Sequence, residues 1–550
     1  MHRTWKPGRE HDVLWYMDAI CGRKPIMNNG TMLQGFEWDL PADGRHWRRL
    51  AFWARWLAFC GFTAVWMPPA SKGNGGTQDV GYGVYDLYDL GEFNQKGTVR
   101  TKYGTATEYI ECVEALKRAG IQALADIVLN HRMGGDEKET FRAKICDPDN
   151  RLRASEAAEE IACYTRFTFP GRKGRYSSFI WDHSCFTGCD WNELDPDHHL
   201  FLFEGKSWAR DVDGEKGNYD YLMGCDVDVQ NPAVREELYQ WGLWFLKKTG
   251  VTGFRLDAVK HISAGFYRDW LQALRNQTGQ ELYAVGEYWN SDLQTLTHYL
   301  DQTEGKTQLF DIPLHYHLSE ASRSNGAYDM RNMLAGTLVD TRAQHAVTFV
   351  DNHDTQPGQS LESWVDGWFK AAAYGLILLR KEGYPCVFWG DLEGIPARGI
   401  GSVSELRRLM RLRLYNAYGT ERDWFDDPDI IGLTRDGSRE IPGSGLAFLC
   451  TNARGGTKRM EVGKCFAGRI FHCAVGGQED VTIDCDGWGE FAVSDGGCSV
   501  YVPAAGLLVK AWRLVQDIKR IIGNRSNGSE DGALNRDKVE TEKNTPRQRI

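Results

Sequence analysis

Eight short apolar segments recur along this 550-residue chain, and each ends in polar or acidic residues. Segments this apolar are typical of strands buried on both faces, as parallel strands are. The stretches between them carry helical periodicity, as in residues 106–120, where Tyr109, Val113 and Leu116 are three or four positions apart. The predicted strands lie within residues 31–38, 62–69, 121–131, 252–261, 282–289, 307–314, 346–354 and 385–391.

Eight strand–helix units predict a (β/α)8 barrel, an α/β fold of the TIM type. The alternative is a doubly wound open sheet, which also alternates strands and helices. Polar residues follow several different strands at their C-terminal ends. Barrel active sites are built at that end of the strands, so this placement favours the barrel.

Two stretches depart from the strand–helix alternation. The third and fourth strands are separated by far more residues than one helix requires, which predicts a domain inserted between strand 3 and helix 3. After residue 420, period-two runs such as 445–450 and 498–503 predict a C-terminal antiparallel β-sandwich domain. The polar end of the chain is typical of a disordered tail. The predicted boundaries are 1–130 and 226–420 for the barrel, 131–225 for the insert, 421–515 for the sheet domain and 516–550 for the tail.

Charge and composition restrict the partners. The formal net charge of −10 argues against nucleic acid, which requires clustered Lys and Arg. No apolar run approaches the roughly 20 residues that span a bilayer. The apolar stretch near the N-terminus, residues 13–17, is too short for a signal-peptide core. We therefore expect a cytoplasmic monomer that does not bind membranes. The heavy aromatic content fits either a large core or stacking on sugars, and composition does not separate the two.

Two carboxylates follow consecutive predicted strands. Asp257 ends GFRLD, and Glu287 ends AVGE. Retaining glycoside cleavage needs one carboxylate to attack the sugar and another to protonate the leaving oxygen, about 5–5.5 Å apart. Arg255 shares a strand face with Asp257, and its charge would keep that nucleophile ionised. A single strand-end acid more often caps a helix or pairs with Arg, but two on neighbouring strands favour catalysis.

A third acid and two histidines end other predicted strands. Asp354 follows His353 in FVDNHDT, and a further anion would stabilise an oxocarbenium-like transition state. His131 and His353 each follow an Asn and could donate hydrogen bonds to sugar hydroxyls. A lone strand-end His is more often structural, and the repeated Asn-His pair argues for function.

These segments resemble the α-amylase family of glycoside hydrolases, in particular the liquefying bacterial type and intracellular fungal α-amylases. The similarity runs from about Thr31 to about Val502. It rests on ADIVLNH (125–131), GFRLDAVKHI (253–262), VGEYW (285–289), FVDNHDT (349–355) and DVGYGVYDLYDLGEF (79–93).

The resemblance implies a role for each matching residue. Asp257 would be the nucleophile, Glu287 the general acid/base and Asp354 the third carboxylate. Tyr82 would stack beneath the reacting sugar. The other implied substrate-binding residues are His131, Arg255, Lys260, His261, Trp289 and His353.

The resemblance also implies one structural Ca²⁺ between insert and barrel. Its ligands would be the Asn130 amide, the carboxylates of Asp220 and Asp226, and the His261 carbonyl, all oxygen donors of the kind Ca²⁺ prefers. Asp228 remains from the family's second, sodium-bridged cluster, but its other positions hold Thr187, Ala209 and Gln230, so we expect no such cluster. Asn452 stands where a further calcium site would need an acid.

Three functions stay open at this stage. The leading one is endo-hydrolysis of α-1,4-glucosidic bonds in starch- or glycogen-type glucans. The second is a 4-α-glucanotransferase, in which another sugar replaces water. The third is an inactive glucan-binding protein, and the presence of all three acids argues against it.

Overall fold

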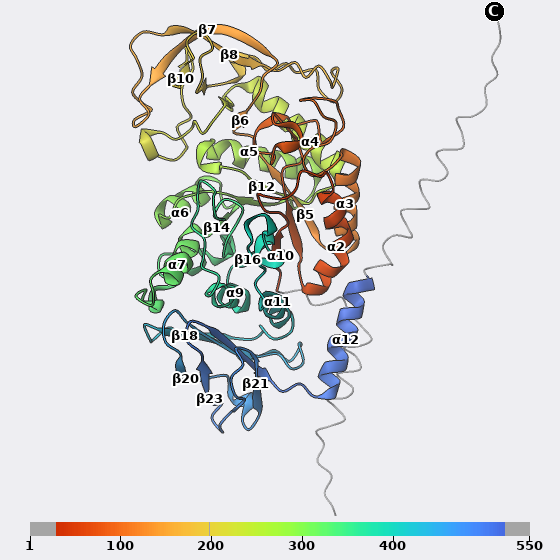
Figure 1. The fold of residues 1–550 in the computed structure, drawn as a ribbon, viewed down its shortest axis with the longest axis vertical. Helices are drawn as coiled ribbons and strands as arrows, with labels where there is room; N and C mark the ends of the chain where they lie inside the picture. The colour runs from red at the N-terminus through yellow and green to blue at the C-terminus, as the bar shows by residue number, and fades with distance from the viewer. Residues whose placement is uncertain (1–28, 197, 523–550) are drawn as a thin grey trace, which may run out of the picture.

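The computed structural model describes residues 29–196 and 198–522, and its core is a closed barrel of eight parallel strands (Figure 1). The order around the barrel is β1-β16-β15-β14-β13-β12-β5-β2. Each of the eight predicted strands is present, so the barrel prediction is confirmed. The strands are β1 (Met32–Gln34), β2 (Ala64–Met67), β5 (Gln122–Ile127), β12 (Gly253–Leu256), β13 (Tyr283–Gly286), β14 (Gln308–Phe310), β15 (Ala346–Phe349) and β16 (Tyr384–Phe388).

Helices cover the outside of the barrel, and capping residues set their ends. The side chain of Asn231 caps α4, Pro232 occupies its first turn, and Gly250 ends it at φ 72°. That left-handed turn directs the chain into β12, the strand that carries Arg255. The helices are α2 (His46–Cys60), α3 (Ala106–Arg118), α4 (Pro232–Thr249), α5 (Ala264–Thr278), α6 (Leu293–Gln302), α7 (Ile312–Arg323), α8 (Leu338–Thr341), α9 (Lys370–Leu379), α10 (Trp389–Glu393) and α11 (Leu406–Tyr415).

The predicted insert lies between β5 and α4, beyond one end of the barrel (Figure 1). It contains a four-stranded sheet in the order β8-β7-β10-β9 and a short pair, β11 with β6. In that pair Asp226 lies opposite His131, so a predicted metal ligand adjoins a predicted sugar-binding residue. The strands are β6 (His131–Arg132), β7 (Glu137–Cys146), β8 (Glu159–Arg166), β9 (Gly188–Cys189), β10 (Leu200–Phe203) and β11 (Cys225–Asp226); β3 (Lys72–Gly73) and β4 (Val84–Asp86) form a separate pair.

The predicted C-terminal antiparallel domain is also present. A six-stranded sheet, β17-β18-β19-β24-β21-β22, and the pair β20-β23 enclose a core that includes Leu449, Phe471 and Phe491. The strands are β17 (Glu421–Trp424), β18 (Ile430–Arg435), β19 (Leu446–Thr451), β20 (Gly456–Glu461), β21 (Ile470–Val475), β22 (Val481–Thr482), β23 (Trp488–Val493) and β24 (Cys498–Pro503).

The end of the described chain differs from the prediction. The predicted tail starts at residue 516, whereas helix α12 (Leu507–Ile522) continues through that position. Its third turn is held by Asp517, which pairs with Arg411 at 2.6 Å. The polar composition of the chain end predicts disorder from residue 516. Residues 516–522 are instead helical, because Asp517 pairs with Arg411 of α11. The remainder of the predicted tail, 523–550, lies outside the described residues.

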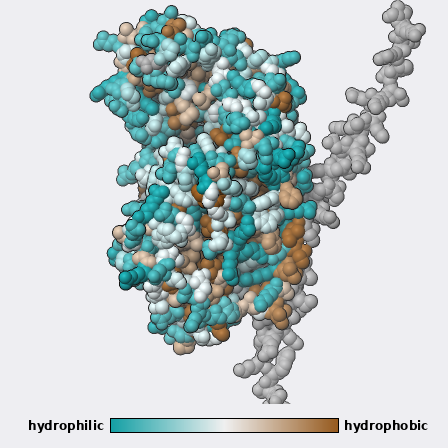
Figure 2. Space-filling model, viewed as in Figure 1, coloured by the Kyte–Doolittle hydropathy of each residue, from teal (hydrophilic) through white to brown (hydrophobic). Residues whose placement is uncertain are grey.

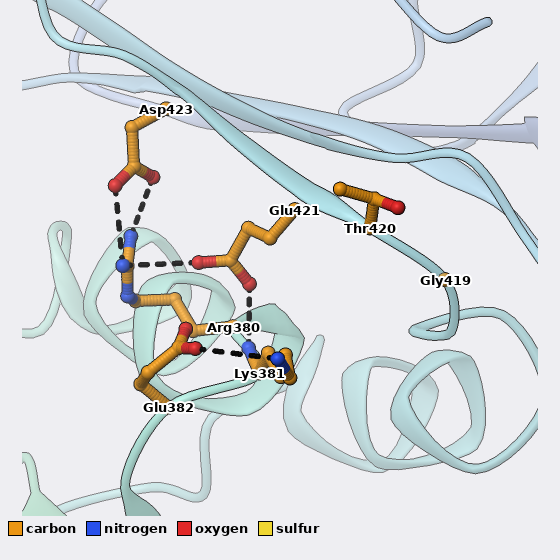
Figure 3. Close-up of a pocket in the computed structure, with 7 residues that line it drawn as sticks. All are labelled: Arg380, Lys381, Glu382, Gly419, Thr420, Glu421 and Asp423. Carbon is orange, nitrogen blue, oxygen red and sulfur yellow. Dashed lines mark hydrogen bonds and ion pairs between the residues drawn. The ribbon is translucent and has the colours of Figure 1, made fainter.

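A polar cavity of about 670 Å³ marks the junction of barrel and sheet domain (Figure 3). Arg380, just after α9, donates from Nη1 to Oδ1 of Asp423 at 2.6 Å, and its Nη2 lies 2.9 Å from Oε1 of Glu421. Both acids belong to β17, and Glu421 is almost fully buried. This ion-pair cluster therefore fastens the first strand of the sheet domain to the barrel.

Candidate active site

The two predicted catalytic carboxylates lie side by side at the C-terminal end of the barrel. Asp257 directly follows β12, and Glu287 directly follows β13. The strands pair in register with Leu256 opposite Gly286, and the backbone N–H of Glu287 donates to the carbonyl of Leu256 at 3.0 Å. The barrel register therefore brings the two carboxyl groups to the same place.

One buried guanidinium connects the acids. Arg255 donates from Nη1 to Oδ1 of Asp257 at 2.6 Å, and its Nη2 lies 2.8 Å from Oε2 of Glu287. The same Nη1 also donates to Oδ1 of Asp126 at 3.0 Å. Arg255 is fully buried, so water screens these contacts little. It fixes both predicted catalytic groups at once.

Asp126, in β5, is a site residue that sequence analysis missed. Its Oδ2 accepts hydrogen bonds from the Trp66 indole and the Tyr82 hydroxyl, each at 2.9 Å. Asp126 thereby positions both Arg255 and the aromatic ring predicted to stack beneath a sugar. An acid inside an otherwise apolar strand was the available signal, because a buried charge in a strand needs a partner.

Burial, rather than the arginine, dominates the electrostatics of Asp257. Loss of hydration raises its pKa to about 7. The charge of Arg255 lowers this pKa, whereas the neighbouring charges of Glu287 and Asp126 raise it. Arg255 lowers the pKa of Asp257, as the sequence predicts, but burial raises that pKa by more. Burial also raises the pKa of Asp354 well above its ordinary value, with Glu287 adding to the effect. Four carboxyl groups and one guanidinium thus share a poorly hydrated site, in which burial favours the protonated forms of Asp257 and Asp354.

Aromatic rings line one side of the acids. Tyr82 stacks on His353 with ring centroids 5.2 Å apart, and Trp38 stacks on Tyr82 at 6.0 Å with nearly parallel planes. Gln34 donates to Nδ1 of His353 at 2.9 Å, which leaves the proton on Nε2. That Nε2 is buried, lacks a hydrogen-bond partner among the described residues and lies 3.4 Å from Asp354 Oδ2. It is a free donor beside the acids.

His131 lies on the same side. Its Nε2 donates to the carbonyl of Tyr82 at 2.8 Å. Burial lowers its pKa to about 4, so the ring is neutral at physiological pH. The contact orients both His131 and the backbone that carries Tyr82.

The opposite side is formed by the segment after β12 and by the insert. Nζ of Lys260 lies 2.9 Å from Oε2 of Glu215 and donates to the carbonyl of Trp289 at 3.2 Å. Nδ1 of His261 donates to the carbonyl of Tyr219 at 2.7 Å. These contacts hold the insert against the barrel at the edge of the site.

A cavity of about 280 Å³ opens between these walls. It brings together eight of the predicted site residues, while Arg255 and His353 are fully buried and do not line it. Seven lining residues were missed: Trp38 ends an aromatic-rich run, Tyr219, Leu222 and Met223 belong to the insert, Ala258 follows the predicted nucleophile, and Ser360 and Leu361 gave no sequence signal. The lining residues are Trp38, Tyr82, His131, Tyr219, Leu222, Met223, Asp257, Ala258, Lys260, His261, Glu287, Trp289, Asp354, Ser360 and Leu361.

The four predicted calcium ligands lie close to one another, mostly buried. The Asn130 amide contacts the His261 carbonyl at 2.8 Å and Oδ1 of Asp226 at 3.5 Å. Oδ2 of Asp226 is buried without a hydrogen-bond partner in the described chain. Burial raises the pKa of Asp220 to about 7 and that of Asp226 well above its ordinary value. The charge of Asp228 raises both pKa values further, and that of Asp220 also raises the pKa of Asp226.

An unpartnered buried carboxylate oxygen beside further acceptors is the environment that a cation would complete. Rotation of the Asn130 amide would exchange its N–H for its oxygen, which gives the amide, two carboxylates and a carbonyl as donors. No group of three or more His, Cys, Asp or Glu side chains suited to a metal occurs within residues 29–196 and 198–522. The fit to Ca²⁺ therefore depends on the amide and carbonyl oxygens as well as the two acids.

Comparison with known proteins agrees with the fold. Residues 55–400 match the family described as "Alpha amylase, catalytic domain", and residues 449–502 match "Alpha-amylase C-terminal". The chain belongs to the α-amylase family and is a glycoside hydrolase.

Among its relatives, an α-amylase of Geobacillus stearothermophilus is 51% identical over 86% of this chain and 87% of that protein. The cytoplasmic α-amylase of Escherichia coli is 42% identical over 86% of this chain and 99% of that protein. A solved α-amylase structure from Anoxybacillus superposes with a TM-score of 0.58 at 16% identity, over 88% of this chain and all of that one, which supports the fold. None of the described helices combines the length and apolar character needed to cross a bilayer.

Proposed function

We propose that this enzyme is an endo-acting, retaining hydrolase of α-1,4-glucosidic bonds in starch- or glycogen-type glucans and maltooligosaccharides. The observation that carries the proposal is the shared contact of Arg255 with Asp257 and Glu287 at adjacent strand ends. A retaining mechanism requires two carboxylates about 5–5.5 Å apart, one to attack and one to donate a proton. A single guanidinium that contacts both acids supports such a close placement.

In the proposed reaction, Glu287 protonates the glycosidic oxygen while Asp257 attacks the anomeric carbon. The leaving sugar departs with that proton, and the glucosyl group is bonded to Asp257. Glu287, now ionised, removes a proton from water, which attacks the anomeric carbon and releases Asp257. The configuration is inverted twice and so retained.

The surrounding residues supply binding and charge stabilisation. The ring of Tyr82 would stack on the reacting sugar, and the free Nε2–H of His353 would donate to one of its hydroxyls. Asp354 would stabilise positive charge on the sugar ring in the transition state. His131, Lys260, His261 and Trp289 complete the substrate contacts in this proposal.

The proposal includes one Ca²⁺ held by Asn130, Asp220, Asp226 and the His261 carbonyl. The ion would balance the buried carboxylates and bind the insert to the barrel, with no direct part in bond cleavage. By binding the His261 carbonyl, the ion would fix the position of the His261 side chain, which lines the cavity.

We also propose that the enzyme is a cytoplasmic monomer with a glucan substrate and no nucleic-acid or membrane partner. The similarity to the cytoplasmic α-amylase of Escherichia coli supports the location. So do the cysteines of the described residues, all of which are free thiols, as in proteins of reducing compartments.

The test follows the anomer released from maltoheptaose by NMR, with product lengths measured in parallel. Retention gives the α-anomer first; initial β-anomer would contradict the mechanism. Products longer than the substrate would show that a sugar acceptor replaces water, and glucan binding without products would indicate an inactive protein.

A second experiment assigns the two carboxylates. Glu287→Gln should lower turnover of maltoheptaose by about 10³-fold, yet cleave α-maltosyl fluoride far better, because fluoride leaves without a proton. Asp257→Asn should lose both activities. Glu320→Gln, on the exposed side of α7, is the matched control and should change neither. Equal losses on both substrates for Glu287→Gln would contradict its role as the acid.

A further inference from the structure

One buried acid of the insert contacts the loop that begins with Glu287, the predicted general acid. Asp213 lies between β10 and β11 and is 5% exposed. Its Oδ2 accepts hydrogen bonds from the Tyr288 hydroxyl at 2.9 Å and from the Asn290 side-chain amide at 3.1 Å. These two residues flank Trp289, and the first of them directly follows Glu287. Asp213 itself does not line the active-site cavity.

The contacted loop connects β13 to α6 and carries two predicted site residues. Residues 287–292 have no regular secondary structure, so contacts with other segments set their position. Nζ of Lys260 donates to the Trp289 carbonyl at 3.2 Å. Asp213 adds contacts on both sides of Trp289. The insert therefore restrains the same backbone that places Glu287 and Trp289.

Asp213 is itself fixed to the segment after β12. Its backbone N–H donates to the Lys260 carbonyl at 2.9 Å, and its own carbonyl accepts from the backbone N–H of Tyr219 at 2.9 Å. Its Oδ1 accepts from the backbone N–H of Glu215 at 2.8 Å, and the Glu215 side chain pairs with Lys260. Asp213 therefore joins the insert, the segment after β12 and the loop after β13.

The carboxylate of Asp213 is buried and nevertheless ionised at neutral pH. Figure 2 shows that the visible surface of the insert, at the top of the view, is mainly hydrophilic, as expected where charged side chains reach water. Asp213 is instead dehydrated, and burial alone would raise its pKa. The hydrogen bonds from its three donors and the charge of Lys260 together outweigh burial and leave this pKa below its ordinary value. Ionisation strengthens each of the three hydrogen bonds that the carboxylate accepts.

The residues placed by this loop belong to the leaving-group side of the site. In the proposed mechanism Glu287 protonates the glycosidic oxygen, so the departing sugar lies next to Glu287. Trp289 and Lys260 line the same cavity. Asp257, by contrast, is held by Arg255 from within β12. Loss of the insert contact should therefore disturb proton donation and binding of the departing sugar, and leave the nucleophile in place.

We propose that Asp213 is a positioning residue for the leaving-group side of the active site. Its carboxylate holds Tyr288 and Asn290. This contact sets Glu287 against the glycosidic oxygen and Trp289 against the departing part of the glucan. The role rests on the proposed function, because it requires Glu287 to be the proton donor.

Asp213→Ala tests this role with two substrates. The kcat/KM for maltoheptaose should fall by about 10- to 100-fold, because a misplaced acid and a misplaced binding ring both raise the barrier. The kcat/KM for α-maltosyl fluoride should stay within about threefold, since fluoride leaves without a proton and no sugar occupies the leaving-group side. Both values report the steps up to the glucosyl-enzyme, and their ratio does not depend on the fraction of folded enzyme.

Tyr288→Phe is a second variant, which keeps the aromatic ring and removes one donor to Asp213. It should produce a smaller loss of the same selective kind, and it should add little to the loss in Asp213→Ala. Asp182→Ala is the matched control in the insert, because the Asp182 carboxylate also accepts two hydrogen bonds, both from Ser184. This control should change neither activity.

Equal losses on the two substrates would overturn the role of Asp213, since a general disturbance of the fold has that effect. Normal activity of both variants on maltoheptaose would overturn it as well. If Asp213→Ala does not fold, the selectivity of Tyr288→Phe decides in the same way.

Glu287→Gln, measured alongside, separates failure of this role from failure of the proposed function. Fluoride cleavage retained in Glu287→Gln, together with equal losses in Asp213→Ala, overturns only the positioning role. Equal losses in Glu287→Gln contradict its assignment as the acid, and the role of Asp213 with it.

Discussion

Arg255 and Asp257 are joined by a 2.6 Å hydrogen bond although only one residue separates them in the chain. Alternate residues of a strand point to the same face, so both side chains reach the mouth of the barrel together. The second terminal nitrogen of Arg255 remains available for Glu287 on the next strand. The i, i+2 spacing of Arg255 and Asp257 thus helps to fix the position of Asp257 relative to Glu287, which follows the neighbouring strand.

Replacing Arg255 by Met should lower kcat/KM by at least about 10²-fold. Without the guanidinium, the acids repel each other unscreened and neither keeps its orientation. Arg255→Lys retains the charge but cannot contact three carboxylates, so its loss should be nearly as large. Steady-state kinetics on a maltooligosaccharide measure the effect; a Lys variant with normal kcat/KM would show that charge alone suffices.

Asp126→Asn should shift the acidic limb of the pH–activity profile to lower pH. The Asp126 charge raises the pKa of Asp257, so its removal lowers that pKa and leaves the nucleophile ionised in more acidic solution. The pH dependence of kcat/KM reports this shift. A variant that loses activity at every pH without moving the limb would mean that Asp126 acts only by holding Tyr82 and Trp66.

Calcium should stabilise the protein more at pH 8 than at pH 5.5. Burial gives Asp220 a folded pKa of about 7, above its ordinary value of 3.8, and it also raises the pKa of Asp226 well above that ordinary value. The metal-free protein therefore loses stability on their account as pH rises from about 4 through about 7, by an amount on the order of a few kcal/mol. Below about pH 7, a calcium ion must displace protons from Asp220 and Asp226 before it binds. Above that pH the two carboxylates are ionised, and the ion relieves the repulsion between them.

Thermal unfolding with and without EDTA at the two pH values checks this prediction. Asp220→Asn should weaken the dependence of the calcium effect on pH, because only Asp226 would then exchange a proton for the ion. An equal calcium shift at both pH values would show that the ion, if bound, lies at other residues.

Arg380→Met should destabilise the protein by up to about 3 kcal/mol, because the buried Glu421 loses its 2.9 Å ion pair and keeps only the longer one with Arg435 at 3.7 Å and the backbone N–H of Lys381. Activity per folded molecule should stay unchanged, since the cluster is remote from the acids. Arg459→Met, which breaks the exposed pair with Asp484, is the matched control and should cost less than about 1 kcal/mol. Urea unfolding compares the two; similar losses would mean that the junction adds no stability.

Much of the barrel could be predicted from sequence because its strands are buried on both faces and interrupted by helices. Asp257 and Glu287 could be placed together because strand-end position fixes location in this fold. Asp126 was missed because it stands inside an apolar run, where the pattern indicates core. The contact of Lys260 with Glu215 depends on how the insert folds over the barrel, and local sequence carries no information about it. The order of residues 516–522 likewise depends on a distant partner, Arg411.

The barrel is closed by its first and last strands, with Met32 paired to Cys386. During synthesis, β1 therefore emerges long before its neighbour on that side and presents an unpaired edge in the meantime. The insert, whose strands pair among themselves, is complete well before the ring can close. Folding on the ribosome should thus yield a structured insert on an open, aggregation-prone half-barrel, and this interval is where the nascent chain depends most on a chaperone.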